Sequence, residues 1–483
     1  MYCGDEVAAI VGDVGTDTCK FSYGGEDSPK HVFSSTAGYL QVAETSIRDG
    51  GAGGAVGMDV DGGVARVGTG VGGARGPGGG RWLVGDLAFS RRRDGMEMRN
   101  PLVNGLMSDW EQIEKLWEHA FEHRLRATAS ERPVLVAEAS WSTAKERRGL
   151  MELMFEKFGV PAMYPAKNAV LSAFSAGRAT ALVCDCGHGA TSAVPVVDGY
   201  VLNRAVQRGI RGGDWLTQQV YTYLAGKGVP ITPRYAINLA PGDKQAVQLL
   251  KAGSAVGSAS AVSAGAKGKA SVKDSPRSLT GSVVDAAFPG THPSYAHLMR
   301  MEIVRELKET CMRIPLDEST SEEDEEEETE YFLPDGTKIE LTDELRNIPD
   351  MLMEGSAMAP LNNVQDNLRL DLPLPSLLRS RGLEMSDADA RKEMAGNVVL
   401  TGGGSLFDGM PERITSELTA SLPSAFKARA VRTLTASPIE RRFSVWIGGS
   451  ILCSLGTFQQ LWLSKRQYEE QGAEVAENRR FQG

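Results

Sequence analysis

The sequence predicts an α/β fold made of two similar domains that face each other across a cleft. The first observation is a strand–glycine turn–strand pattern that occurs twice, at residues 8–27 and 181–199. The second is a further glycine turn at 398–409, after another β-branched run, which suits close backbone approach to a base or ribose. The third is the length of 483 residues, enough for two large cores.

Each repeated hairpin has an Asp at the entrance of its turn, Asp13 in the first copy and Asp185 in the second. Backbone amides at such a turn can bind phosphate oxygens, and a carboxylate can hold a hydrated divalent cation. We therefore expect the two carboxylates to face each other and to hold Mg²⁺ through water. The amides around Gly15–Thr16 and Gly187–Gly189 would bind phosphates, with Lys20 as a point charge. The alternative is an ordinary hairpin with a structural Asp.

Composition and charge narrow the class of protein. Hydrophobic residues make up 41% and charged residues 24% of the chain, which is typical of globular domains. The net charge of −10 argues against a dominant nucleic-acid-binding surface. We expect no membrane span and no signal peptide. We expect the 6 cysteines to be reduced thiols without a zinc site, with Cys184 and Cys186 on opposite faces of a strand.

Helix and strand signals fill the chain around these hairpins. Residues 108–127 predict a helix capped by Ser108, with Glu111 completing a capping box and apolar residues that pack in the core. A buried strand is expected at 133–139. Further elements are expected as helices at 143–158, 168–177 and 301–313, a glycine turn and helix at 209–226, and a hairpin at 331–341.

Four segments have compositions unlike a packed domain. The glycine-rich stretch 49–80 and the low-complexity stretch 251–282 are expected to be a flexible loop and a disordered insert. The acidic run 317–330 is expected to be a solvated linker, and docking of basic histone tails is the alternative interpretation. The end of the chain, 464–483, is expected to fray.

These residues resemble the actin family, and the match extends beyond the hairpins. Residues 133–179 are similar to the actin segment that leads into its second phosphate hairpin, and residues 438–470 are similar to the C-terminal region of actin. The opening of the chain, YCGDEVAAIVGDVGTDTCKFSYGGEDSPK, is similar to the nuclear actin-related protein four subfamily. The resemblance implies an actin-like ATPase fold, with duplicated ribonuclease-H-like cores around a cleft for ATP and Mg²⁺.

The resemblance also implies where the domains begin and end. It places a first actin-like domain at 1–166 and a second at 167–443. The remaining residues, 444–483, would form C-terminal helices that pack back on the first domain.

Contacts to the base and ribose are carried over from actin by resemblance. Lys308 and Glu309 match its adenosine contacts, and Arg442 stands where actin has a lysine beside the adenine. The residues expected to bind the nucleotide are Asp13, Gly15, Thr16, Lys20, Asp185, Gly187, His188, Gly189, Gly212, Lys308, Glu309, Gly402, Gly403, Leu406 and Arg442. The alternative is that they are relics of the fold in a protein that no longer binds nucleotide.

Several positions depart from the residues that actin uses for hydrolysis. Asn168 stands at the position of the water-positioning Gln, His188 at an Asp, and Ser192 at a His. Asp17 replaces a Gly in the first hairpin, where its charge would repel phosphates unless it points away or is neutralised. Phosphoryl transfer depends on positioning and charge stabilisation, so we expect slow or absent ATPase activity. His188 could instead donate to a phosphate, or be a satisfied surface histidine.

Two filament contacts of actin are missing, and one partner site is retained. The insert at 49–80 replaces the loop that grips the neighbouring subunit, and 353–384 does not match the actin plug, so a homopolymer is not expected. The hydrophobic cleft in which actin binds amphipathic helices is matched by Phe174, Leu452, Leu455, Thr457 and Leu461. The alternative is that these residues are interior core.

The resemblance implies a nuclear scaffold subunit. Members of the subfamily pair with actin on a long helix, the HSA segment, of a chromatin-remodelling ATPase or a histone acetyltransferase scaffold. Histones are further candidate partners; a membrane and sequence-specific nucleic-acid binding are not expected. The alternatives are a cytoskeletal filament ATPase, and a sugar kinase or chaperone ATPase of the same broad fold.

Overall fold

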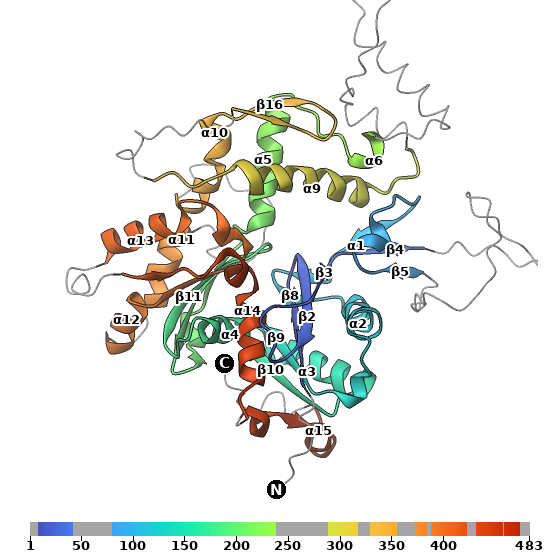
Figure 1. Ribbon diagram of the computed structural model, residues 1–483, viewed down its shortest axis with the longest axis vertical. Coiled ribbons are helices and arrows are strands. Elements are labelled where there is room, and N and C mark those ends of the chain that lie inside the picture. Colours follow the sequence, from blue (N-terminus) through green and yellow to red (C-terminus); the bar gives the residue numbers. More distant parts are fainter. Residues whose placement is uncertain are drawn as a thin grey trace, which may run out of the picture.

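The computed structural model describes residues 8–41, 80–237, 288–316, 329–354, 372–383, 388–422, 431–456 and 458–473. These residues form two α/β domains that lie next to each other (Figure 1). The insert predicted at 251–282 lies outside the described residues. So do 49–80 and 317–330, apart from Gly80, Thr329 and Glu330.

The first domain is built on a sheet with the strand order β19-β10-β9-β1-β2-β3. Its hairpin pairs β1 with β2 antiparallel, whereas β1, β9 and β10 run parallel. Every residue of β9 is buried, as expected for a parallel strand that is covered on both faces. The strands are β1 (Ile10–Val14), β2 (Thr18–Tyr23), β3 (His31–Ser34), β9 (Val134–Glu138), β10 (Ala162–Lys167) and β19 (Leu463–Ser464).

The second domain repeats this pairing. Its sheet has the order β13-β12-β11-β17-β18, with β14 paired to β12. Again a hairpin, β11 with β12, is antiparallel, and its first strand runs parallel to the strands that follow, β17 and β18. The strands are β11 (Ala181–Cys186), β12 (Thr191–Val197), β13 (Tyr200–Val201), β14 (Gln207–Gly209), β17 (Val398–Thr401) and β18 (Thr433–Leu434). The duplicated α/β fold predicted from the two hairpins is confirmed.

Two helices join the domains. α4 (Asn168–Ser175) leads from the first sheet to the second, and α14 (Pro438–Cys453) packs along it while contacting both sheets (Figure 1). A Cβ atom on Gly448 of α14 would lie only 1.8 Å from the carbonyl oxygen of Leu171, so glycine is required where the helices cross. The predicted domain boundary between 443 and 444 falls inside α14.

The C-terminal segment packs on the first domain. Trp446 is buried and donates from Nε1 to the carbonyl oxygen of Val11 at 3.1 Å. The expectation of a frayed end from 464 is wrong for its first residues, because Ser464 caps α15 (Lys465–Gln471) and Tyr468 stacks on Phe155. Residues 474–483 lie outside the described chain.

The other elements surround these sheets. A small sheet with the order β5-β4-β6 extends the first domain, and α9 lies across the second, with α1 and β4 near one end of the helix (Figure 1). These elements are β4 (Ala37–Leu40), β5 (Arg81–Leu83), α1 (Asp86–Phe89), β6 (Glu97–Arg99), β7 (Leu102–Val103), β8 (Leu106–Met107), α2 (Trp110–Glu118), α3 (Ala144–Glu152), α5 (Gly213–Gly226), α6 (Arg234–Ile237), α9 (Pro293–Cys311), β15 (Glu330–Phe332), β16 (Lys338–Glu340), α10 (Asp343–Arg346), α11 (Leu374–Leu377), α12 (Ala388–Ala395) and α13 (Met410–Ser421).

Three local expectations are wrong. Asp109, not Ser108, caps α2, because the Ser108 hydroxyl donates to the carbonyl oxygen of Pro101 instead. α9 begins at Pro293 rather than near residue 301. Cys184 and Cys186 share one face of β11, with Sγ atoms 3.8 Å apart, because residues two apart in a strand point the same way.

Two expectations about helices are confirmed. The apolar residues of α2, such as Ile113 and Trp117, are fully buried. Thr143 and Glu146 form a capping box at the start of α3. Among the described cysteines all are free, and no described helix has the length and apolar character that crossing a membrane requires.

His119, just after α2, is held in its neutral form. Arg124 donates from Nε to His119 Nε2 at 3.0 Å, so that nitrogen carries no proton. The ring also packs edge-on against Phe33, with centroids 4.9 Å apart. Burial, with the nearby charges of Arg124 and His123, lowers the pKa of His119 from 6.5 to about 4.

This pKa predicts a loss of stability in mild acid. Between pH 6.5 and pH 4 the unfolded chain binds a proton at His119 that the folded chain excludes, so the free energy of unfolding falls as the pH falls. From pH 7 to pH 5 we expect the unmodified chain to lose about 2 kcal/mol more than His119→Gln. Urea denaturation of both proteins at both pH values measures this. Equal losses in the two proteins would contradict it.

Candidate functional site

A cavity of about 390 Å³ lies between the two hairpins and is lined by residues of both domains. It brings together every residue predicted to bind nucleotide except Gly212. Gly212 instead packs against the backbone of the second hairpin, since a Cβ atom there would lie 2.4 Å from the carbonyl oxygen of His188. The predicted residues that line the cavity are Asp13, Gly15, Thr16, Lys20, Asp185, Gly187, His188, Gly189, Lys308, Glu309, Gly402, Gly403, Leu406 and Arg442.

The two predicted cation-binding carboxylates both face this cavity. Lys20 donates to Asp13 Oδ2 at 2.9 Å. Burial lowers the pKa of Lys20, but the charge and the hydrogen bond of Asp13, together with Cys19 and Asp17, outweigh burial, and the net pKa lies above its usual value. Burial and then the charge of Asp13 raise the pKa of Asp185 to about 6. The cavity therefore holds a negative charge at Asp185 that the protein does not fully compensate.

The chemistry of these two carboxylates suits a divalent cation. Asp13 and Asp185 are the residues that would hold it, because oxygen ligands suit Mg²⁺. Within the part of the chain that the structure describes, no group of three or more acidic, His or Cys side chains could coordinate a metal. Such an ion would therefore depend on water and on ligand oxygens, as Mg²⁺ commonly does.

Some backbone amides of the two turns form hydrogen bonds within the protein, and others do not. Gly15 N donates to the carbonyl oxygen of Thr18 at 3.1 Å, and Gly187 N donates to that of Ala190 at 2.9 Å, so these two amides close the turns. These two amides are engaged by the protein, so the predicted binding of phosphates stays with their neighbours in the same turns. Within the described residues, no protein hydrogen bond uses the amides at the two tips, Thr16–Asp17 and His188–Gly189, which can receive an anion.

Asn168 is held in place by the protein. Its Oδ1 accepts from Ser140 N at 3.0 Å and from Ser140 Oγ at 2.6 Å. Its Nδ2 points to Asp185 Oδ2 at 3.4 Å. Its oxygen and one of its two N–H groups are engaged by the protein, so the side chain is positioned to orient Asp185. Ser192, another of the positions that depart from the residues used for hydrolysis, is buried in β12.

Asp17 is neutralised across the cleft. Arg305 of α9, in the second domain, donates from Nη1 to Asp17 Oδ1 at 2.8 Å. His188 lies nearby, with Nε2 3.9 Å from Asp214 Oδ1. Burial lowers the pKa of His188, and the neighbouring acidic groups oppose this effect. His188 is therefore neutral at pH 7 and can donate one hydrogen bond into the cavity.

The opposite wall of the cavity combines a buried lysine with a glycine turn. Lys308 donates to Gly213 O at 2.8 Å and to Thr217 Oγ1 at 3.0 Å, and burial lowers its pKa to about 8. Glu309 and Arg442 are exposed at the rim. Gly402 has φ +87°, and a Cβ atom there would lie 2.6 Å from Asp185 Oδ1. Only glycine allows the turn to approach the carboxylate so closely.

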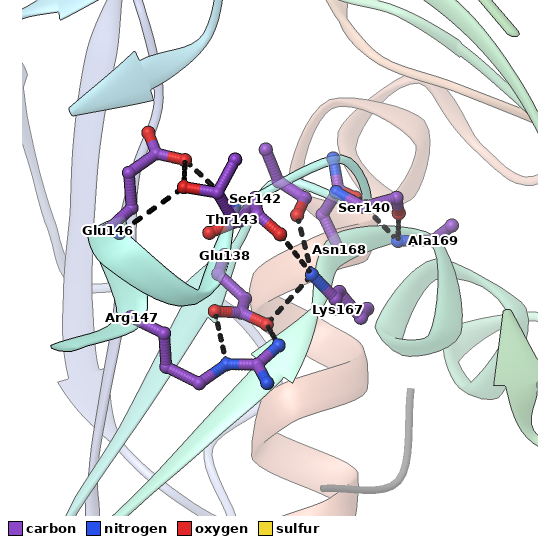
Figure 2. A network of polar contacts seen from close by, with 10 residues as sticks. Glu138, Ser140, Ser142, Thr143, Glu146, Arg147, Lys167, Asn168 and Ala169 are labelled. Carbon is purple, nitrogen blue, oxygen red and sulfur yellow. Dashed lines mark hydrogen bonds and ion pairs between the residues drawn. The ribbon is translucent and has the colours of Figure 1, made fainter. Parts of the chain in front are cut away.

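A buried charge network adjoins the cavity, whose lining includes Glu138, Ala139 and Asn168. Figure 2 shows the contacts of this network. Glu138 pairs with Arg147 through both of its oxygens, and Lys167 Nζ lies 3.0 Å from Glu138 Oε1. Lys167 also donates to the carbonyl oxygens of Ala139 at 3.2 Å and Ser142 at 3.4 Å. Burial lowers the pKa of Lys167, and Glu138 opposes that shift. Arg147 and Lys167 together compensate the charge of Glu138, and a second carboxylate, Glu146, belongs to the same network.

The predicted partner groove is only partly an open surface. Leu455 is 44% exposed, and Ile451 beside it is 41% exposed. Leu452 is buried in the first core, and Phe174 and Leu461 are half-buried against it. Thr457 lies outside the described residues. Leu455 is therefore the predicted residue best placed to contact a partner.

Residues that the sequence analysis missed include Arg305 and Ser140. Arg305 stands three residues before Lys308 in a helix, a spacing that places both on one face and could have revealed it. The role of Ser140 depends on two parallel strands, β9 and β10, that end side by side. No local sequence pattern predicts the contact between Ser140 and Asn168.

Comparisons with known proteins agree with these features. The family model described as Actin matches residues 4–481. A protein of Arabidopsis thaliana named "Actin-related protein 4" is 34% identical over 486 residues, covering 98% of this chain and 98% of its own. Proteins with the same name are 35% identical over 490 residues in Oryza sativa subsp. japonica, with 98% of each chain covered, and 30% identical over 486 residues in Yarrowia lipolytica, with 100% and 98% covered.

Substitutions at two neighbouring glycines test whether the turn beside Asp185 requires glycine. Gly402→Ala would force a Cβ atom to 2.4 Å from the carbonyl oxygen of Cys186, at a positive φ, whereas Gly403→Ala meets nothing within 4 Å. We expect the first change to lower the free energy of unfolding by at least about 2 kcal/mol and the second by less than about 1 kcal/mol. Urea titration compares them, and equal losses would show that the turn tolerates a side chain.

Proposed function

Because this chain belongs to the actin family, we propose that it is a non-polymerising nuclear actin-related protein that binds ATP and Mg²⁺ as a scaffold subunit. In this proposal it pairs with actin on a helical segment of chromatin-remodelling and histone acetyltransferase complexes. The observation that carries it is the cavity between the two hairpins, which gathers nearly all residues predicted for the nucleotide from distant parts of the chain.

The cavity suits a nucleoside triphosphate with a divalent cation. A volume of about 390 Å³ lies within the range of small-molecule sites. Asp13 and Asp185 supply the acidic end, and the amides at the two hairpin tips supply donors for phosphate oxygens. Lys20, which lines the cavity, would add a positive charge for a polyanion. A glycine turn on the other wall leaves room for a base or ribose.

The site favours retention of ATP over hydrolysis. Hydrolysis requires a group that orients the attacking water, and the side chain at that position, Asn168, is bound at both ends by Ser140 and Asp185. Ser192 is buried in a strand and cannot replace it. Bound ATP would stabilise the closed pair of domains by mass action, without turnover.

The partner side of the proposal is supported by relatives and by one exposed apolar site. Relatives named "Actin-related protein 4" match almost the entire chain. Leu455 and Ile451, exposed at the end of α14, offer an apolar surface for the amphipathic face of a helix.

Nucleotide content tests the cofactor directly. We expect the purified protein to carry close to one equivalent of ATP, not ADP, and to keep it as ATP for hours at 25 °C. Asp185→Asn removes the charge beside the cation and should lower occupancy more than about tenfold. Asp198→Asn is the matched control, because Asp198 lies in the hairpin beyond β12 with φ 52°, which Asn accepts. Chromatography of the released nucleotide measures both.

Affinity purification from the protein's own cells tests the partners. We expect actin together with a remodelling ATPase or an acetyltransferase scaffold to copurify. Leu455→Asp places a charge in the apolar surface and should lower that recovery more than about tenfold, whereas Ile439→Asp, at a more exposed position at the start of α14, should not.

Other outcomes of these experiments would contradict the proposal. Recovery of the protein alone, or with capping and cross-linking proteins of the cytoskeleton, would favour a cytoplasmic filament role. Sedimentation of the purified protein under polymerising conditions would do the same. Purified protein without nucleotide, and without affinity for added ATP, would favour the interpretation that the site is a relic of the fold.

A further inference from the structure

We infer that a second pocket, within the first domain, is a docking site for an acidic peptide segment of a partner protein. The segment would place an Asp or Glu carboxylate next to a large apolar side chain. The pocket lies between β5 with α1 on one side and the end of α2 on the other, and Figure 1 shows these elements close together. All of them belong to the first domain, so the inference does not depend on the nucleotide cavity.

The pocket has a volume of about 430 Å³, which lies within the range of ligand sites. One wall, formed by β5 and α1, is apolar. Trp82 and Leu83 form its buried part, and Val84 is partly exposed. Leu87 at the rim is 85% exposed, the highest value for a large apolar side chain among the described residues. A ligand that covers Leu87 would remove apolar surface from water, which is favourable.

The opposite wall contains a cation without a carboxylate partner. Arg124 is half-buried, and its Nε donates to His119 Nε2 at 3.0 Å. Its guanidinium lies 5.6 Å from the ring centroid of Phe33. In the part of the chain that the structure describes, neither Nη group of Arg124 has a hydrogen-bond or ion-pair partner. These two groups can therefore bind a carboxylate through two parallel hydrogen bonds.

The local backbone explains how Arg124 is positioned. The turn after α2, His119–Leu125, is π-helical, and a π-helix connects residues five apart. This spacing brings His119 and Arg124 together on one side of the turn. Gly85 has φ +90°, and a Cβ atom there would lie 3.0 Å from His119 Nε2 and 3.4 Å from Arg124 Nη2. Glycine therefore allows the chain between β5 and α1 to approach Arg124, which brings the two walls together.

The other charges of the pocket do not replace this missing partner. Glu118 is paired with Lys115 at 2.8 Å. Glu122 and Arg81 are exposed at the rim, one of each sign. The half-buried Arg124 therefore remains uncompensated, and a charge interacts more strongly where water is partly excluded.

The two walls together select the class of ligand. A carboxylate complements Arg124, and a large apolar side chain beside it complements Leu87 and the wall of β5. A phosphate compound without apolar groups would meet Arg124 but would leave the apolar wall in water. A peptide segment that combines an acidic and an apolar residue satisfies both walls.

Binding of labelled peptides to the full chain tests the site. The probes are short fluorescein-labelled peptides with a central Leu or Phe flanked by Asp and Glu. In two matched sets, Lys replaces the acidic residues or Ser replaces the apolar residue. Fluorescence anisotropy measures each dissociation constant. We expect the acidic, apolar peptides to bind at least about tenfold more tightly than either matched set, because each replacement removes one of the two interactions.

Substitutions on the two walls locate the binding. Leu87→Asp and Arg124→Gln should each weaken binding of the preferred peptide at least about tenfold. The matched controls are Phe332→Asp and Arg204→Gln, which make the same changes at exposed residues of the second domain and should leave the affinity unchanged. Thermal melting verifies that each variant is folded. Leu87→Asp keeps the test decisive if Arg124→Gln is unstable, because Leu87 is already in water.

Four results would overturn the inference. The first is equal affinity for the acidic peptides and their Lys counterparts. The second is binding that survives both wall substitutions, which would place the peptide elsewhere. The third is displacement by tripolyphosphate that is equally strong in the unmodified chain and in Leu87→Asp, which would indicate a simple anion site. The fourth is binding that appears only after residues 49–79 are replaced by a short linker, because the occupant would then be the chain's own segment that precedes β5.

Discussion

The approach of two carboxylates, Asp13 and Asp185, is the constraint around which the cleft is arranged. Each stands at the end of the first strand of a hairpin, and the pKa of Asp185 is raised to about 6 by burial and by Asp13. Like charges in a poorly hydrated site are unfavourable unless cations compensate them. Lys20 compensates Asp13, and a bound divalent ion would compensate the remainder. The position of the Asp185 carboxylate is then fixed by Asn168, by Ser140 and by the turn at Gly402.

The duplication that creates the site provides for binding more readily than for hydrolysis. Two hairpins with nearly identical pairing supply two equivalent walls, so phosphate binding needs little beyond what the fold provides. Hydrolysis needs an additional group that is free to move with a water molecule. In this chain the side chain at that position serves the protein, because Ser140 and Asp185 hold both ends of Asn168. Binding and turnover can therefore be lost separately.

Local patterns in the sequence predicted the fold and most of the cavity. Strand–turn–strand signals around Asp13 and Asp185, and the glycine turn at 398–409, depend on neighbouring residues, and resemblance to a known family supplied Lys308. Features that depend on distant packing were missed. Arg305 has its partner, Asp17, in the other domain and 288 residues away in the sequence, and Ser108 loses the cap to Asp109 because the chain bends back to Pro101. The cysteine pair was misplaced by misjudging strand periodicity, although the sequence contained the answer.

The crossing of α4 and α14 has a mechanical consequence. At Gly448 the two helices are as close as backbones can be, and serine hydroxyls of the two helices, on Ser172 and Ser444, meet at 3.2 Å. Because both helices contact both sheets, this crossing serves as the fulcrum for any rotation of one domain against the other. Contacts at the far end of the cleft act on a long lever arm, so even a modest attraction there exerts a large torque against opening. A weak contact placed far from the axis can thus control a large movement.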